Sequence, residues 1–202
     1  MKLRNAEKRL LIAVSQIIEN EGFSKIGVNK IAKQAKCDKV LIYRYFGGLE
    51  GLLAAWAKDN DFYTLAYQAY SERVTKAESS EDIIKLTQTV LLKQLNFLRT
   101  NKLMQELLAW ELSGNSTFRS IQDEREGNGF KLQEELEKKL GKESKDVRMF
   151  ITILIASINY IVLATRQYRI FNGIDFSNPE AWELCKQTIY KYIRALFENI
   201  LK

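Results

Sequence analysis

The segment VNKIAKQAKCDKVLIYRYFGG, residues 28–48, decides the fold of the N-terminal part of the chain. Apolar residues recur in it at helical spacing, at Val28, Ile31, Ala32 and Ala35, and predict a short helix. A further helix is predicted at about Lys39–Phe46, with Asp38 as its N-cap and Gly47–Gly48 at its end. Two short helices joined by a tight turn have the proportions of a helix-turn-helix.

Helices are also predicted on both sides of this segment. A first helix presents one apolar face, made of Leu10, Val14, Ile17 and Ile18, and Gly22 stops it. A long fourth helix is predicted to start near Leu49 and run toward Tyr70. Four helices then fit into about seventy residues.

The whole chain is predicted to be all-α, because apolar residues keep helical spacing and no alternating runs with turn dipeptides occur. Polar breaks separate helical segments at about 81–99, 102–112, 117–140, 146–170 and 178–201. Gly127 and Gly129 make a kink or break plausible in the third of these. The last can start with a Ser177–Glu180 capping box or with Asn178 before Pro179.

The composition argues against an enzyme. The chain of 202 residues has no histidine, which removes the usual general base and the commonest zinc ligand. Cys37 and Cys185 match no metal spacing and suggest reduced thiols. No cofactor or metal is implied. No signal peptide is recognised and no stretch is judged long enough to cross a bilayer, so we expect a cytoplasmic protein without a membrane partner.

The positive charge lies in the N-terminal segment. Residues 1–58 hold eleven Lys and Arg against five acidic residues, whereas residues 59–202 hold twenty against twenty. A small basic module joined to a neutral body suggests a head that binds a polyanion, although a merely solvated basic surface is the alternative.

The predicted helix at 39–46 has a surface suited to a nucleic-acid groove. With Ile42 and Phe46 facing inward, six residues remain on its other sides: Lys39, Val40, Leu41, Tyr43, Arg44 and Tyr45. Arg44 can bind guanine with two hydrogen bonds, and Val40 and Leu41 can touch thymine methyl groups. Lys39 and the two tyrosines can reach phosphates or base edges. The alternative is an ordinary helical hairpin with half-buried tyrosines.

A resemblance decides between these alternatives. The pattern Gly22-Phe23, Val28-x-x-Ile31-Ala32-x-x-Ala35, Ile42-Tyr43-x-Tyr45-Phe46 and Glu50-x-Leu52-Leu53 resembles the DNA-binding domain of the tetracycline-repressor (TetR) family, with its LYxYF recognition helix. The resemblance covers roughly residues 5–55 and implies a helix-turn-helix DNA-binding domain at 1–48. It further implies a helical effector-binding and dimerisation domain at 49–202, so that a homodimer binds double-stranded operator DNA.

Three positions depart from that family pattern. Gly27 stands where the family usually has a hydroxyl residue that caps the second helix and can meet a phosphate. Lys36 replaces a usual turn glycine, so the turn is made without it or with strain. Gly47-Gly48-Leu49 replaces a stretch that commonly carries lysine, although the backbone amides there could still bind phosphate.

The resemblance also implies roles for the C-terminal helices. The last two would pair with a second subunit, and the apolar stripe of the final helix supplies the candidates: Trp182, Cys185, Ile189, Ile193, Leu196, Phe197 and Ile200. The alternative is that this stripe packs on the protein's own core. A pocket for a small-molecule effector of unknown identity is expected around Phe62, Phe97, Met104, Trp110, Phe118, Asn159 and Tyr160. Asn159 interrupts an apolar run, and a buried amide needs hydrogen-bond partners.

The expected function is therefore a ligand-responsive repressor. An activator, a regulator that answers to a protein partner, and a helical adaptor that has lost DNA binding remain alternatives. A helical enzyme is a further class, but no nucleophile–base pair supports it.

Overall fold

The structure is a computed structural model that describes residues 5–112 and 119–200. Its elements are, in chain order, α1 (Asn5–Glu21), α2 (Val28–Gln34), α3 (Val40–Phe46), α4 (Leu49–Asn60), α5 (Phe62–Thr75), α6 (Ser80–Thr100), α7 (Lys102–Leu112), α8 (Arg119–Leu140), α9 (Ser144–Ala164), strands β1 (Ile170–Phe171) and β2 (Ile174–Asp175), and α10 (Pro179–Ile200). Short 3-10 turns lie at Phe23–Lys25 and Gly141–Glu143. The prediction of an all-α fold is confirmed, with one small hairpin added.

The chain divides into two compact units. Unit 1 comprises Met1–Asp61 and Asn101–Glu124, and unit 2 comprises Phe62–Thr100 and Arg125–Lys202. Unit 1 therefore holds α4 and α7 together with the helix-turn-helix, and is larger than the segment 1–48 predicted as the DNA-binding domain.

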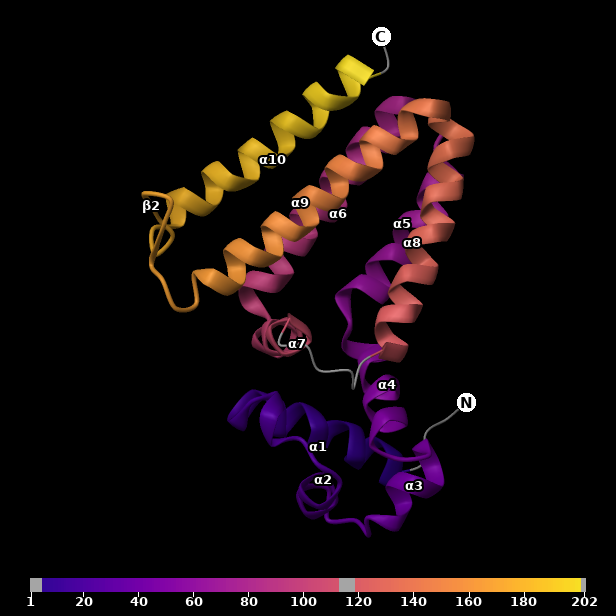
Figure 1. Cartoon of the computed structure of the whole chain (residues 1–202), viewed down its shortest axis with the longest axis vertical. Helices are drawn as coiled ribbons and strands as arrows, with labels where there is room; N and C mark the ends of the chain where they lie inside the picture. Colours follow the sequence, from indigo (N-terminus) through magenta and orange to yellow (C-terminus); the bar gives the residue numbers. More distant parts are fainter. Residues whose placement is uncertain (1–4, 113–118, 201–202) are drawn as a thin grey trace. The chain divides into compact units, whose positions relative to one another are not determined.

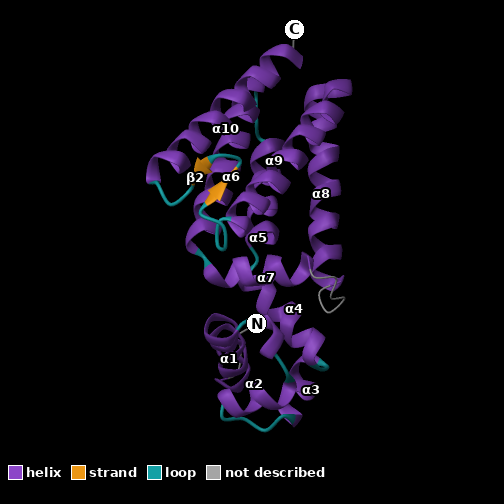
Figure 2. Ribbon diagram, turned by 60° about the vertical axis from the view of Figure 1, so that its left-hand side comes forward, coloured by secondary structure: helices purple, strands orange, loops and turns teal. Residues whose placement is uncertain are grey.

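The core of unit 1 is built on the apolar face of α1. Leu10, Val14 and Ile17 are buried there, as their spacing predicts, and α1 packs against α2, α4 and α7. Trp56 on α4 is buried, and its indole N–H donates a hydrogen bond to the Ser15 hydroxyl (2.9 Å). Figure 2 shows α1, α2 and α3 as a short three-helix group.

The turn between α2 and α3 is closed by backbone hydrogen bonds around Lys36. The Cys37 N–H donates to Ala32 O (3.0 Å), and the Lys36 N–H donates to Lys33 O (3.2 Å). This pair of bonds is a Schellman motif, which needs a left-handed residue at its C′ position. Lys36 takes that conformation with φ 50°. A residue with a side chain is strained there, so the turn is made with strain, which was one of the two possibilities that the sequence left open.

The long helix predicted from Leu49 toward Tyr70 is interrupted. α4 ends at Asn60, Asp61 is extended (φ −81°, ψ 111°), and α5 begins at Phe62. Apolar spacing continues across Asp61, which is why the pattern predicted one helix. The interruption falls at the boundary between the two units.

Unit 2 is organised around α6, which packs against α5, α9 and α10. In Figure 1 the three helices α6, α9 and α10 run alongside one another. Leu91, Leu95 and Leu98 of α6 are buried in this core. α8 runs through Gly127 and Gly129 as one continuous helix, so the break considered there does not occur.

Between α9 and α10 the chain forms an antiparallel hairpin that the sequence reading missed. Ile170 pairs with Asp175 and Phe171 with Ile174. Asn172 (φ 49°) and Gly173 (φ 76°) form the two-residue turn, and Asn-Gly is the dipeptide that such turns favour. The helix predicted to reach residue 170 therefore ends at Ala164. Asn178, not Ser177, caps α10, because its Oδ1 accepts the Glu180 N–H (2.9 Å).

Candidate nucleic-acid interface

One side of α3 is exposed and carries mixed cationic and apolar groups. Val40 and Tyr43 are 59% and 57% exposed, and Lys39 and Arg44 are exposed beside them. Ile42 is fully buried, as predicted, and anchors the opposite side of the helix. Large apolar groups rarely gather on a surface next to cations without a binding role.

Leu41 and Tyr45 lie at the edges of this face. Both are partly buried, and the Tyr45 ring meets the Phe46 ring edge-on, with centroids 6.5 Å apart. Four of the six residues proposed from sequence therefore have exposed side chains, whereas the side chains of Leu41 and Tyr45 are partly packed against the protein.

The position of α3 is fixed at both ends. Asp38 Oδ1 accepts the Val40 N–H (2.8 Å), as the predicted N-cap should. At the other end Gly47 is left-handed (φ 74°), and its N–H donates to Tyr43 O (2.9 Å). A Cβ on Gly51 of α4 would overlap the backbone carbonyl of Phe46, so only glycine permits this close approach of α4 to the end of α3.

The helix before the turn is held by polar contacts to α1. The Gln34 side-chain amide donates to Gln16 Oε1 (2.8 Å), and Lys30 forms an ion pair with Glu21. Gly27 precedes α2 in an extended conformation (φ −175°) and supplies no side-chain cap. As the sequence predicts, the N-terminus of α2 therefore has no hydroxyl side chain to cap it.

The residues proposed for an effector pocket do not form one group. Phe62 lines a cavity in unit 2, and Phe97 stacks on Phe62 with centroids 5.0 Å apart. Tyr160 is exposed and packs on Phe171 of the hairpin. Met104 and Trp110 are on α7 in unit 1, where Trp110 stacks on Phe23 (5.5 Å). Phe118 lies outside the described residues.

The cavity in unit 2 is lined by four helices: by Phe62, Tyr63, Ala66 and Tyr70 of α5, Thr87, Val90, Leu91 and Gln94 of α6, Leu132 of α8, and Ile151 and Ile155 of α9. Asn159 lies beside it, and its Oδ1 accepts hydrogen bonds from the Tyr63 hydroxyl (2.5 Å) and the Gln94 amide (2.9 Å). The prediction that Asn159 needs buried partners is met by these two side chains. Sequence reasoning missed Gln94, although a glutamine inside the apolar run of α6 was a comparable signal.

The apolar stripe of α10 faces its own chain. Trp182, Ile189, Ile193 and Phe197 are buried, and α10 packs on α6. For these four residues the structure matches the alternative, an intramolecular core, whereas Cys185, Leu196 and Ile200 are only partly buried. The large apolar residues that α10 exposes are Leu184, Tyr190 and Tyr192.

The prediction that no stretch is long and apolar enough to cross a membrane is wrong by the criteria of length and composition. The continuous helical stretch Arg125–Ala164, which ends with α9, passes that test by length and composition. Only 17% of its apolar window is buried. The sequence reading missed it because Asn159 and scattered polar residues break the run.

A family model matches the N-terminal part of the chain, and solved structures match nearly all of it. Residues 11–56 match the family model described as bacterial regulatory proteins, tetR family. No curated protein matches the sequence. The solved structures it resembles share the fold at low identity. A TerR/AcrR-family transcriptional regulator from Aquifex aeolicus has TM-score 0.61 and 15% identity, covering 95% of this chain and 99% of that one.

Two further structures agree. A TetR-family regulator from Marinobacter aquaeolei has TM-score 0.60 and 18% identity, with 93% and 94% of the two chains covered. NalD of Pseudomonas aeruginosa, described as the secondary repressor of the MexAB-OprM multidrug efflux pump, has TM-score 0.61 and 15% identity, with 92% and 94% covered. The family match shows a tetR-family DNA-binding domain at residues 11–56, and the solved transcriptional regulators share their fold with nearly the whole chain.

Proposed function

We propose that the protein is a ligand-responsive repressor that binds a pseudo-palindromic operator as a homodimer in the cytoplasm. The observation that carries DNA binding is the exposed face of α3, on which Lys39, Val40, Tyr43 and Arg44 lie together. A helix of this kind enters the major groove and reads base edges. The net charge of +6 held by residues 1–58 supplies the attraction to phosphate.

The roles of the two cations differ. Arg44 lies one turn after Val40 on the exposed face, where a guanidinium can bind the O6 and N7 of guanine. Lys39 lies at the start of α3, where an ammonium group is suited to a phosphate. Arg44 then contributes to sequence preference and Lys39 to affinity for any duplex.

Dimerisation is supported by the outward face of α9. Met149, Ile153 and Tyr160 are 61%, 54% and 58% exposed, and they recur at spacings that put them on one side of the helix. An apolar face of this size on a soluble protein marks an interaction surface. α10, packed beside it, exposes Leu184 as well as charged Glu183 and Lys191. Charged residues on the neighbouring helix favour a second copy over lipid as the partner.

The effector response is supported by the cavity in unit 2. Its walls are almost entirely apolar, as the walls of small-molecule sites usually are. The enclosed space is about 30 Å³, enough for a single water molecule. An effector would have to spread α5, α6, α8 and α9, and α5 follows α4 of the DNA-binding unit directly after Asp61. Ligand binding that favours one arrangement of these helices would change operator affinity.

The experiment that tests this function starts from random duplex DNA. The purified protein is used to select bound sequences over several rounds, and the enriched pool is sequenced. We expect an inverted repeat with half-sites about one helical turn apart, because the symmetry of the dimer must match that of the site. Retention of DNA without any enriched repeat would contradict an operator-specific dimer, and no retention would favour an adaptor that has lost DNA binding.

A further inference from the structure

We propose that the cavity of unit 2 selects an uncharged ligand with an aromatic body and one hydrogen-bond donor, which Gln94 Oε1 accepts. This inference rests on the proposed effector response and specifies the chemistry of the effector. It follows from the cavity's polar groups, because all but one of the hydrogen-bonding positions described below are already used within the protein.

Gln94 is a buried polar residue in the cavity wall. It is 2% exposed and lies among the lining residues. Its Nε2 donates to Asn159 Oδ1 (2.9 Å) and to Tyr63 Oη (3.2 Å), and approaches the Ile155 carbonyl oxygen (3.5 Å). A backbone carbonyl is always an acceptor, so this contact sets the amide with its nitrogen toward α9 and its oxygen away.

The oxygen of Gln94 has no hydrogen bond from any described residue. A donor on a bound molecule could bind this oxygen in place of the water for which the cavity has room. Since Gln94 lines the cavity, Oε1 is the atom able to accept that bond there. A ligand that fits this position therefore carries a hydrogen-bond donor and not an acceptor.

The second polar pair in the wall is satisfied internally. Thr87 Oγ1 donates to the Ile83 carbonyl (2.8 Å), so the Tyr70 hydroxyl must be the donor in its 2.6 Å contact with Thr87. The other described lining residues are aliphatic or aromatic, and none of the described ones is charged. A single donor on an apolar body matches this inventory.

Charge selection follows from the same surroundings. The Arg125 guanidinium lies 4.9 Å from the centroid of the Tyr63 ring, next to the cavity wall. A cation entering the cavity would lose its hydration and find no carboxylate among the described lining residues. An anion would gain from Arg125 only across the ring and would lose its hydration in an apolar space. A neutral ligand avoids both costs.

The aromatic body is suggested by the shape of the wall. Phe62 and Phe97 stack with centroids 5.0 Å apart, and the Tyr63 ring meets Phe62 edge-on at 5.8 Å. When the helices spread to admit a ligand, a flat ring can make the same edge-on contacts with the Phe62 and Tyr63 rings of the cavity wall.

The test measures ligand binding to the full chain by calorimetry without DNA, so its outcome does not depend on operator binding. The four probes share one bicyclic ring: 2-naphthol, 2-methoxynaphthalene, 2-naphthoate and 2-naphthylmethylammonium. We expect 2-naphthol to bind about tenfold more tightly than each of the others, the size of effect that one hydrogen bond to a buried acceptor gives. Equal affinity for the methyl ether or the ammonium, or no binding of 2-naphthol, would overturn the proposal.

Two variants of Gln94 locate the effect. Gln94→Leu removes the acceptor and should bring 2-naphthol and its methyl ether to similar affinities. Gln94→Glu places a carboxylate in the cavity and should make the ammonium probe the preferred ligand, a gain that misfolding cannot produce.

Thr89→Val is the control, because Thr89 is an exposed α6 residue whose hydroxyl donates a hydrogen bond within its own helix, to Lys85 O (2.7 Å). Folded Gln94→Glu protein that still rejects the ammonium, or Gln94→Leu that keeps the preference for 2-naphthol, would overturn the assignment. Loss of operator binding with this ligand selectivity intact would instead count against the proposed function alone.

Discussion

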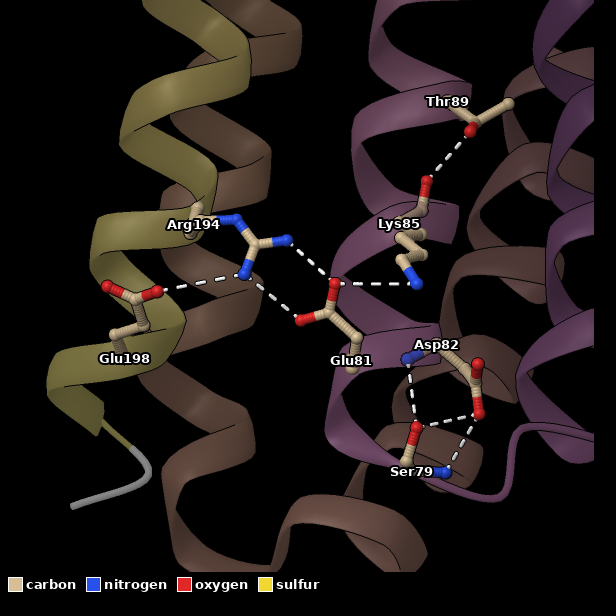
Figure 3. A network of polar contacts seen from close by, with 7 residues as sticks. All are labelled: Ser79, Glu81, Asp82, Lys85, Thr89, Arg194 and Glu198. Atoms are coloured by element: carbon tan, nitrogen blue, oxygen red, sulfur yellow. Dashed lines mark hydrogen bonds and ion pairs between the residues drawn. The ribbon is translucent and has the colours of Figure 1, made fainter.

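Arg194 on α10 and Glu81 in the first turn of α6 form a two-point ion pair, with Nη1–Oε2 3.0 Å and Nη2–Oε1 2.7 Å (Figure 3). Lys85 also reaches Glu81 Oε1 (3.5 Å), and Glu198 lies 3.7 Å from Arg194. The planar guanidinium matches the carboxylate, which makes this geometry more specific than a lysine pair. The pair therefore ties the C-terminal part of α10 to the helix that also lines the cavity.

The first prediction concerns the stability of the protein in acid. The hydrogen bond from Arg194 holds the pKa of Glu81 below its ordinary value of 4.5. The carboxylate form is thus favoured by folding. Its contribution to the free energy of unfolding is present above pH 4.5 and is lost as the pH falls through the lowered pKa. Glu81→Gln should remove this part of the acid sensitivity, and the effect should be small and weaken with salt because both groups are partly exposed to solvent.

Urea unfolding at a series of pH values measures it. Glu78→Gln, a nearby acidic residue in an exposed position, is the matched control. Some acid dependence should remain in both variants, because hydrogen bonds from Ser79 also lower the pKa of Asp82. If Glu81→Gln and wild type lose stability in parallel below pH 4.5, the pair with Arg194 does not act in this way.

The parts of the molecule that sequence predicted well are those fixed by neighbours in the chain. Asp38, Ile42 and Gly47 set the start, the buried side and the end of α3 through contacts within a few residues. Local propensity and spacing are sufficient there. The exposed face of α3 followed because its buried face was known.

The parts that sequence could not predict depend on which helix packs where. The stripe of α10 at Ile189 and Ile193 fits a partner subunit or the chain's own α6 equally well in its spacing, and only the packing on α6 decides. The same holds for Met104, which is buried on α7 in unit 1, whereas the cavity is lined by residues of unit 2. The cavity needs four helices at once, so the sequence could not show that Gln94 lies beside Tyr63 and Asn159.

The second prediction concerns the strained turn at Lys36. Lys36→Gly should raise the free energy of unfolding by about 1 kcal/mol, because a left-handed conformation costs a side-chain-bearing residue about that much and glycine little. Lys33→Gly is the control, since Lys33 is exposed but helical, and glycine there should lower stability by a similar amount. Chemical unfolding of both variants gives the comparison. Lower stability in Lys36→Gly would show that φ 50° at this residue carries no cost.

The third prediction concerns the contact of α4 with the end of α3. Gly51→Ala should destabilise the protein by about 1–3 kcal/mol and weaken DNA binding, because the methyl group overlaps the Phe46 carbonyl and pushes α3 out of place. Gly27→Ala should be tolerated, since a Cβ there meets nothing within 4 Å and the backbone is extended. Thermal unfolding and DNA titration separate the two. A fully stable Gly51→Ala protein would mean that α4 approaches α3 less closely.

The fourth prediction separates the two cations on α3. Arg44→Ala should cost about 1–3 kcal/mol on the selected operator and relax the preference at one base pair. Lys39→Ala should lower affinity for all duplexes and reduce the salt dependence of binding. Lys93→Ala removes the same charge from an exposed position on α6 in unit 2 and serves as the control. Titration of operator and scrambled DNA at two salt concentrations measures these effects. An Arg44→Ala variant that binds the operator as wild type does would count strongly against this placement of α3.

The fifth prediction tests the outward face of α9 as the dimer surface. Ile153→Glu should convert the dimer to a folded monomer at micromolar concentration, because Ile153 is 54% exposed in the single chain and a charge there is costly only when a partner covers it. The monomer should also lose the selected operator, since one recognition helix reaches only one half-site.

Two other substitutions show whether the effect belongs to this face. Ile193→Glu should unfold the protein instead of dissociating it, because Ile193 is buried against its own chain and leaves the charge without water. Asn96→Glu adds the same charge at an exposed position of α6 and should leave the dimer intact. Light scattering gives the oligomeric state and circular dichroism the fold. A folded Ile153→Glu protein that stays dimeric would exclude this face, and the exposed residues Leu184 and Tyr192 of α10 would then be the next surface to substitute.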